Sequence, residues 1–319
     1  MLQQTQVKTV LPYYQKWINK YPTVQSVANA NQEQILKQWE GLGYYGRARN
    51  FHKSCQIIAM QFNGDIPALP EEFSKLPGVG PYISAAVMSI AFHHPLPAID
   101  TNAIRVGSRL KMVKLSSPAD SKAIHRYLSD NIAIKRPGDF NQAIMDLGRE
   151  ICKSKNPTCA LCPVSKFCKA LVNNFVDKYP VKIKSAKKPH YNIAVGVIWH
   201  KGQILISKRR ENGLLGGLWE FPGGKIEKGE NAQKCIVREV KEELGVLVHP
   251  TSFLKQIKHA YTHFSITMNA YHCDYLQGTP RAIGCDNWKW IAPKEIRLFP
   301  FPKANHKLFD KIIAEEGVC

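Results

Sequence analysis

Hydrophobic positions recur with a helical period through the first half of the chain. Between residues 3 and 19 the apolar side chains are Val7, Val10, Leu11, Tyr14, Trp17 and Ile18. This spacing places them along one face of an α-helix. Similar patterns, separated by glycine and proline, occupy residues 32–39, 44–62, 83–92, 102–112 and 121–134. The first half is therefore predicted to be helical.

The pattern changes near residue 190. Apolar runs typical of strands cover residues 192–200, 203–208, 254–260, 265–275 and 287–291. Just before them, residues 178–189 are rich in lysine and flanked by prolines, as in a linker that is either solvated or rests on phosphates. We predict a helical domain over residues 1–172, a basic linker over 173–190 and an α/β domain over 191–319.

The charge of the chain is strongly positive and uneven. The 319 residues carry a formal charge of +19, and residues 1–190 hold 26 Lys and Arg against 12 Asp and Glu. A basic half is typical of proteins that bind a polyanion such as nucleic acid. No apolar run has the length of a membrane span, and no signal peptide is visible. We expect a cytoplasmic protein without a membrane partner, associated with the nucleoid if bacterial.

Four of the nine cysteines lie in one short stretch with the spacing Cys-x6-Cys-x2-Cys-x5-Cys: Cys152, Cys159, Cys162 and Cys168. A serine and two prolines interrupt the helical pattern there, so the thiols are predicted to lie on a loop. Four such thiolates bind either an iron–sulfur cluster or a structural zinc ion. Zinc ribbons usually pair two short arms across a longer gap, so this single loop favours a 4Fe-4S cluster.

Two further features concern the same half. Residues 76–82 read Leu-Pro-Gly-Val-Gly-Pro-Tyr, a glycine turn in which backbone N–H groups around Gly78 and Gly80 can bind a phosphate without reading sequence. Asp100 follows 18 residues after Tyr82. This aspartate is either a helix N-cap or a catalytic carboxylate. The order and close spacing of the turn, the aspartate and the cysteine loop favour the catalytic interpretation.

Together these residues resemble the helix-hairpin-helix DNA glycosylase superfamily. The runs Leu-Gln-Gln-Thr-Gln at residues 2–6 and Gly-Leu-Gly-Tyr-Tyr at residues 41–45, followed by Arg47 and Arg49, are similar to the MutY family of adenine DNA glycosylases. The resemblance implies a monomeric base excision repair enzyme. It would remove adenine mispaired with 8-oxoguanine or guanine from double-stranded DNA, by hydrolysis of the N-glycosidic bond of a flipped nucleotide.

The resemblance also implies catalytic roles. Asp100 would stabilise the oxocarbenium-like sugar, Tyr82 would support it and Asn102 would orient it. The related endonuclease III-type enzymes have a lysine at the position of Tyr82, and its amine forms a Schiff base with the sugar. Tyrosine cannot do so, which implies a monofunctional glycosylase. The family's general acid precedes the run at residues 2–6 and would lie upstream of Met1. We expect either an incomplete sequence or a true truncation that binds lesions without efficient cleavage.

Contacts with DNA follow from the same resemblance. Gly78 and Gly80 would bind a phosphate of the DNA backbone. Gln4 and Tyr44 would wedge into the base stack, while Thr5 and Leu42 would line the 8-oxoguanine. A loop in the second half, Tyr261, Thr262 and His263, resembles the family's lesion-contacting loop.

The second half contains a complete Nudix box, running from Gly224 to Val246. Within it, Glu239, Glu242 and Glu243 fall on one face of a helix, where they would bind Mg²⁺ and diphosphate oxygens or form a solvated acidic face. Residues 219–227 resemble the 8-oxo-dGTP hydrolase MutT. In the glycosylase family this domain reads 8-oxoguanine in DNA, so hydrolysis of 8-oxo-dGTP is the alternative function. The predicted fold is a helix-hairpin-helix domain with an iron–sulfur loop, followed by a Nudix-like α/β/α sandwich.

Overall fold

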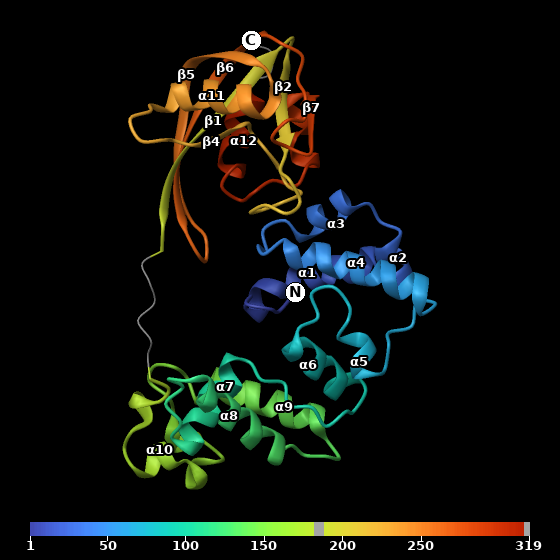
Figure 1. Ribbon diagram of the computed structural model, residues 1–319, viewed down its shortest axis with the longest axis vertical. Helices are drawn as coiled ribbons and strands as arrows, with labels where there is room; N and C mark the ends of the chain where they lie inside the picture. The colour runs from blue at the N-terminus through green and yellow to red at the C-terminus, as the bar shows by residue number, and fades with distance from the viewer. Residues whose placement is uncertain (182–187, 316–319) are drawn as a thin grey trace. The chain divides into compact units, whose positions relative to one another are not determined.

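The computed structural model describes residues 1–181 and 188–315, so residues 182–187 of the predicted linker lie outside the described residues. The chain divides by packing into two compact units (Figure 1). The helical unit is Ile57–Ser185, and the mixed unit joins Met1–Gln56 to Ala186–Cys319. The boundaries predicted at residues 172 and 191 came from composition and stay a prediction.

The helical unit is built from short helices and turns. It contains the end of α4 (Gly46–Gln61), α5 (Pro70–Phe73), α6 (Pro81–Ala91), α7 (Thr101–Lys111), α8 (Pro118–Asp130), α9 (Pro137–Asp146) and α10 (Lys169–Val172). A π-helical turn, Leu147–Ile151, follows α9, and 3₁₀ turns occupy Cys159–Leu161, Ser165–Phe167 and Val176–Lys178.

Local sequence explains where these helices begin. Proline occupies the first turn of α6, α8 and α9, where its missing N–H costs nothing. Before α8, the Ser117 side chain accepts from the backbone N–H of Asp120, whose carboxylate accepts from Ser117 N–H in return. The helix predicted over 121–134 therefore starts earlier, at Pro118, and ends at Asp130.

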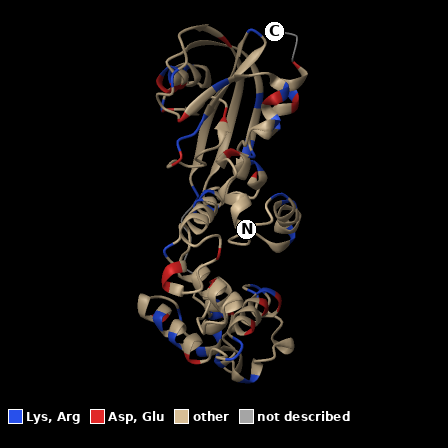
Figure 2. Ribbon diagram, turned by 90° about the vertical axis from the view of Figure 1, so that its right-hand side faces the viewer, with Lys and Arg blue, Asp and Glu red and all other residues tan. Residues whose placement is uncertain are grey.

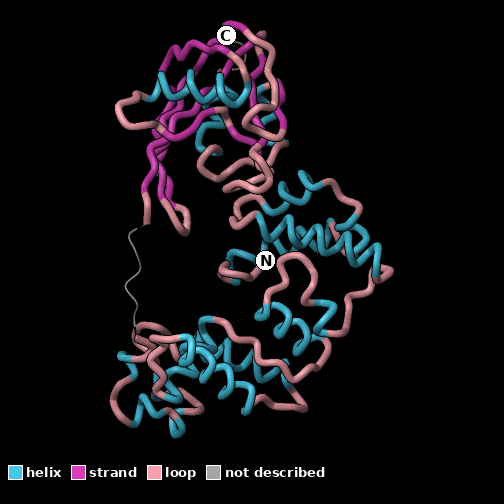
Figure 3. The backbone as a smooth tube through the Cα atoms, viewed as in Figure 1, coloured by secondary structure: helices cyan, strands magenta, loops and turns pink. Residues whose placement is uncertain are grey.

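The mixed unit contains all the strands found among the described residues (Figure 3). Its helices are α1 (Val7–Lys20), α2 (Val24–Ala28), α3 (Gln32–Trp39), most of α4, α11 (Ala232–Leu244) and α12 (His306–Ala314), with a 3₁₀ turn at Pro293–Leu298. Its strands are β1 (His190–His200), β2 (Gln203–Lys208), β3 (Trp219–Glu220), β4 (Gly223–Lys225), β5 (Leu247–Ala260), β6 (Ser265–Gln277) and β7 (Asn287–Ile291).

The strands form one mixed sheet in the order β3-β2-β1-β6-β5, with β4 added to β1 and β7 added to β2. The β1–β6 pairing is parallel and the other pairings are antiparallel. Along β1, side chains alternate between two cores. Ala194 and Ile198 pack with α11, whereas Val197 packs with α12. Helices therefore cover both faces of the sheet.

The first four helices share a core with a loop of the C-terminal part. Leu36 and Trp39 of α3 pack with Leu218, which precedes β3. Lys208 Nζ lies 2.9 Å from Glu33 Oε1, so an ion pair also joins β2 to α3. Segments about 180 residues apart in sequence thus form one compact unit.

Basic residues occur throughout both units (Figure 2). Lys153, Lys155, Lys166 and Lys169 cluster in sequence around the cysteine loop. Within the described residues, no helix is both long enough and apolar enough to cross a membrane.

Candidate functional sites

Asp100 lies at the start of α7, where its carboxylate has two fixed partners. Oδ1 accepts from the backbone N–H of Ala103 over 2.7 Å, which is an N-cap hydrogen bond. Oδ2 accepts from Asn102 Nδ2 over 2.8 Å. Both oxygens are therefore oriented, and the helix N-terminus favours their negative charge. The N-cap and the candidate catalytic carboxylate are the same group.

Tyr82 and Asn102, the two residues predicted to assist Asp100, both lie near it. Burial, and next the charge of Asp100, raise the pKa of Tyr82 above its usual value. The Tyr82 hydroxyl donates to Met145 Sδ over 3.4 Å. This tyrosine therefore stays a neutral hydroxyl beside an aspartate at physiological pH.

Sequence reasoning missed Arg105, which connects this site to the cysteine loop. Its Nη2 donates to Asn102 Oδ1 over 2.9 Å and to the Gly148 carbonyl over 2.6 Å, and its Nε donates to the Cys152 carbonyl over 2.8 Å. A Cβ at Gly148 would lie 2.6 Å from Asn102 Cβ, so only glycine leaves room for this arrangement. A continuous hydrogen-bonded chain thus runs from Asp100 to Cys152.

The four predicted cysteine ligands are all free thiols. Cys152, Cys162 and Cys168 pack against the core of Val106 and Leu110. Burial raises the pKa of Cys159, and the charges of Cys152 and Cys168 add to it. Their chemistry fits the donor set of an iron–sulfur cluster. Within the described part of the chain, however, three or more metal-ligating side chains are nowhere arranged to hold an ion.

Arg109 holds the cysteine loop onto α7. Its side chain is only 2% exposed. The guanidinium donates to the backbone carbonyls of Val176, Tyr179, Cys152 and Lys153 and to Cys152 Sγ, at 2.7–3.3 Å. No lysine could satisfy so many acceptors, because its ammonium has three donors and no planar fork.

The glycine turn lies where it was predicted, between α5 and α6. Gly78 has a φ of +78°, a left-handed conformation that favours glycine. Gly80 is the N-cap residue of α6 and has no side chain to cap the helix. The first N–H groups of α6 are consequently available to an anion.

A cavity of about 480 Å³ lies within the mixed unit. The predicted lesion-contacting residues all line it, from both ends of the chain: Gln4, Thr5, Leu42, Tyr44, Tyr261, Thr262 and His263. Its volume is in the range of small-ligand pockets. The ring centroids of Tyr44 and His263 are 5.9 Å apart, and Tyr44 Oη lies 3.4 Å from His263 Nε2.

Arg47 organises the N-terminal side of this cavity, a role that the sequence did not indicate. Its Nη2 donates to Thr5 Oγ1 and to the carbonyls of Leu42 and Gly43 at 3.1–3.3 Å, while its Nη1 donates to the carbonyls of Met1 and Gln3. The two loops held in this way contain strained backbone. Gln4 and Tyr44 have φ values of +55° and +49°, which cost energy in residues other than glycine.

The Nudix carboxylates are already engaged by arginine. Arg238 Nη1 lies 3.0 Å from Glu239 Oε1 and 3.2 Å from Glu242 Oε2, and Arg238 Nε lies 2.9 Å from Glu230 Oε1. Burial, then the charges of neighbouring glutamates, raise the pKa of Glu243 to about 8. To bind Glu239 and Glu242, Mg²⁺ would have to displace these arginine contacts. The predicted magnesium ligands are thus brought together on α11, but not as a free anionic site.

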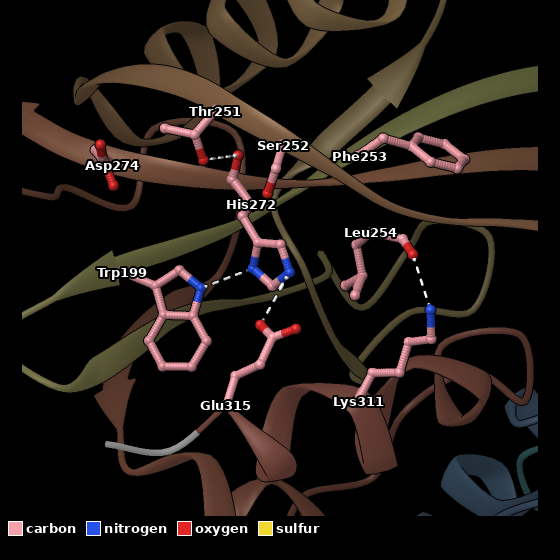
Figure 4. Close-up of a pocket in the computed structure, with 9 residues that line it drawn as sticks. All are labelled: Trp199, Thr251, Ser252, Phe253, Leu254, His272, Asp274, Lys311 and Glu315. Atoms are coloured by element: carbon pink, nitrogen blue, oxygen red, sulfur yellow. Dashed lines mark hydrogen bonds and ion pairs between the residues drawn. The ribbon is translucent and has the colours of Figure 1, made fainter. Parts of the chain in front are cut away.

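A second cavity, of about 280 Å³, lies beside β5, β6 and α12 (Figure 4). Trp199 Nε1 donates to His272 Nδ1 over 3.0 Å, and His272 Nε2 lies 3.0 Å from Glu315 Oε2. The indole therefore selects the imidazole tautomer protonated on Nε2. None of the predicted site residues, all of which the structure describes, lines this cavity.

Two family models match the chain. The one described as "HhH-GPD superfamily base excision DNA repair protein" matches residues 1–131, and the one described as "NUDIX domain" matches residues 194–311. The first range includes Asp100, and the second includes α11 and the sheet. The predicted fold class is confirmed by these matches together with the observed sheet and helices.

Known proteins resemble the chain over most of its length. The adenine DNA glycosylase of Schizosaccharomyces pombe is 32% identical, with 93% of this chain and 75% of the relative covered. The adenine DNA glycosylase of Buchnera aphidicola subsp. Schizaphis graminum is 35% identical, with 83% of this chain and 76% of the relative covered. Among solved structures, a thermostable thymine-DNA glycosylase is 26% identical with a TM-score of 0.50, covering 54% of this chain and 80% of that one.

Proposed function

The chain belongs to the adenine DNA glycosylase family, and we propose that it removes adenine mispaired with 8-oxoguanine or guanine from double-stranded DNA. The observation that carries this proposal is Asp100. Its two oxygens are held by Ala103 N–H and Asn102 Nδ2 at the positive end of α7. A fixed carboxylate is the group that stabilises an oxocarbenium-like sugar while the bond to the base breaks.

The enzyme is proposed to be monofunctional. Hydrolysis breaks the bond between adenine and the sugar carbon, and water supplies the hydroxyl that replaces the base and, in balance, the proton that adenine takes up. Tyr82 stands beside Asp100 as a neutral hydroxyl and has no amine with which to form a Schiff base. The abasic product is therefore released without cleavage of the strand.

Recognition of the lesion is assigned to the cavity of the mixed unit. It has room for a nucleobase, aromatic rings at Tyr44 and Tyr261, and the imidazole of His263. The open N-terminus of α6 would hold a backbone phosphate, which positions the duplex without reading its sequence. The predictions of a monomer and of a cytoplasmic location stay predictions.

One pair of variants separates the two alternative functions of the C-terminal part, which are recognition of 8-oxoguanine in DNA and hydrolysis of 8-oxo-dGTP. We expect His263→Ala to reduce the preference for 8-oxoguanine over guanine opposite adenine by roughly tenfold, because a cavity contact is lost. Glu242→Gln should leave that preference unchanged, since Glu242 belongs to the arginine-paired face. Dissociation constants for the two duplexes measure the effect. An equal loss in both variants would contradict the assignment.

We further propose that Cys152, Cys159, Cys162 and Cys168 hold a 4Fe-4S cluster, supported by their free, half-buried thiols on one loop. The cluster would order that loop and its lysines. Purified protein should contain about four iron atoms per chain. Cys159→Ser should lose iron and DNA affinity together, whereas Cys285→Ser, in the core of the mixed unit, should keep both. Metal analysis that finds zinc in anaerobically prepared protein would refute the proposal.

Two assays on the same preparation test the function. Adenine release from a duplex with adenine opposite 8-oxoguanine is expected, whereas Mg²⁺-dependent hydrolysis of 8-oxo-dGTP is not. The reason is that Arg238 already pairs with two of the three Nudix carboxylates. Rapid hydrolysis of 8-oxo-dGTP without adenine release would overturn the proposed function in favour of a nucleotide hydrolase.

A further inference from the structure

The end of α3 grips the backbone of a C-terminal segment, residues 299–306. Lys37 Nζ donates to the Phe299 carbonyl over 3.0 Å and to Glu40 Oε2 over 2.6 Å. Glu40 Oε1 accepts from Phe301 N–H over 2.8 Å and lies 3.0 Å from His306 Nε2. One glutamate thus has partners at both ends of the stretch from 301 to 306.

This glutamate connects two segments that line the large cavity, residues 41–46 and 302–303, which are called its two walls below. Immediately after it, residues 41–46 line the cavity from the N-terminal side. Pro302 and Lys303, which also line the cavity, lie in sequence between the two residues that Glu40 contacts, Phe301 and His306. The spacing of the walls therefore depends on contacts made by a side chain that does not itself line the cavity.

The side chain of Glu40 is held in one position by burial and by hydrogen bonds. Its side chain is 14% exposed, and Phe301 is fully buried. Burial alone would raise the pKa of Glu40, but hydrogen bonds from His306, Lys37 and Phe301 N–H outweigh it, so the pKa lies below its usual value. The carboxylate remains charged, and removing it would leave the buried N–H of Phe301 without its acceptor and Lys37 with only the Phe299 carbonyl.

We propose that Glu40 is a positioning residue for lesion recognition, which sets the distance between the two walls of the cavity. The proposal rests on the proposed function, because it assigns 8-oxoguanine to that cavity. It assigns no contact with DNA to Glu40. Its effect should appear as a change in the choice between 8-oxoguanine and guanine rather than as a general loss of folding.

Glu33 provides a matched control. It lies on α3, which Glu40 follows directly, and also joins this helix to the C-terminal part, through Lys208 at 2.9 Å, but it does not line the cavity. A merely structural role would make Glu40→Ala and Glu33→Ala behave alike. Glu40→Gln keeps an acceptor for Phe301 N–H, so it tests rescue by a conservative change.

The experiment measures dissociation constants for two duplexes, with adenine opposite 8-oxoguanine or opposite guanine, and the thermal midpoint of each variant. Glu40→Ala should lower the preference for 8-oxoguanine by about tenfold. Glu40→Gln should retain most of it, and Glu33→Ala should retain all of it. An unchanged preference in Glu40→Ala, or an equal loss in Glu33→Ala, would overturn the role given to Glu40 and leave the proposed function standing. Absence of any preference in the unaltered chain would overturn the proposed function as well.

Discussion

Asp100→Asn is expected to slow adenine excision on the order of 10³-fold, because the carboxylate acts on charge that develops only in the transition state. Single-turnover release of adenine from a duplex with adenine opposite 8-oxoguanine measures the rate. Affinity for the same duplex should change little. If binding and excision declined together, Asp100 would be a structural residue.

Asparagine is the informative substitution because it can still cap α7. Its side-chain oxygen can accept from Ala103 N–H, as Asp100 Oδ1 does at 2.7 Å, while Asn102 Nδ2 loses its acceptor. The free energy of unfolding should therefore fall by only about 1 kcal/mol. Asp120→Asn removes one charge from the exposed start of α8 in the same unit and is the control for net charge. Its excision rate should equal that of the unaltered chain.

Arg109→Ala should have the largest effect on stability. It removes a buried guanidinium and takes the donor from the carbonyls of Lys153 and Tyr179. The carbonyls of Cys152 and Val176 each lose one of two donors. Buried acceptors left unpaired cost about 1–3 kcal/mol each when fully desolvated. We expect the free energy of unfolding to fall by at least about 3 kcal/mol, with loss of iron from the cysteine loop.

Urea unfolding followed by circular dichroism measures this difference. Arg126→Ala, on the exposed face of α8, is the matched control and should change the free energy of unfolding by less than about 0.5 kcal/mol. Arg109→Lys should behave more like the alanine variant than like the unaltered chain, because a lysine cannot serve all these acceptors. Equal stability of the Arg109→Ala and Arg126→Ala variants would disprove the role given to Arg109.

Local signals predicted much of the helical unit and of the sheet. The helix predicted over 102–112 is α7, because its start carries an N-cap aspartate and its apolar positions keep the helical period. Strand β5 is longer than the predicted 254–260, since Pro250 and irregular pairing near Phe253 and Lys255 disturb the alternation in its first half. Helix α12 was missed although Leu308, Phe309 and Ile312 carry its period.

The parts that could not be predicted depend on tertiary contacts. Nothing in the spacing of Arg47, Glu40 or Arg105 tells which backbone groups they reach, because those partners lie in other segments. The arginine pairing of the Nudix carboxylates likewise required the geometry of α11 and the preceding loop. Sequence could name residue types suited to the chemistry, whereas the structure shows which of them are already engaged.

The large cavity has a consequence for genetics. Its walls come from residues 4–49 and 213–303, while Asp100 and the cysteine loop come from the middle of the chain. A stop codon between those for residues 168 and 213 would therefore remove one wall of the cavity and spare the codon for Asp100. Alleles of this kind should be screened for indiscriminate removal of adenine, and not only for its absence, because the residues that line the cavity are encoded on both sides of the segment that contains Asp100.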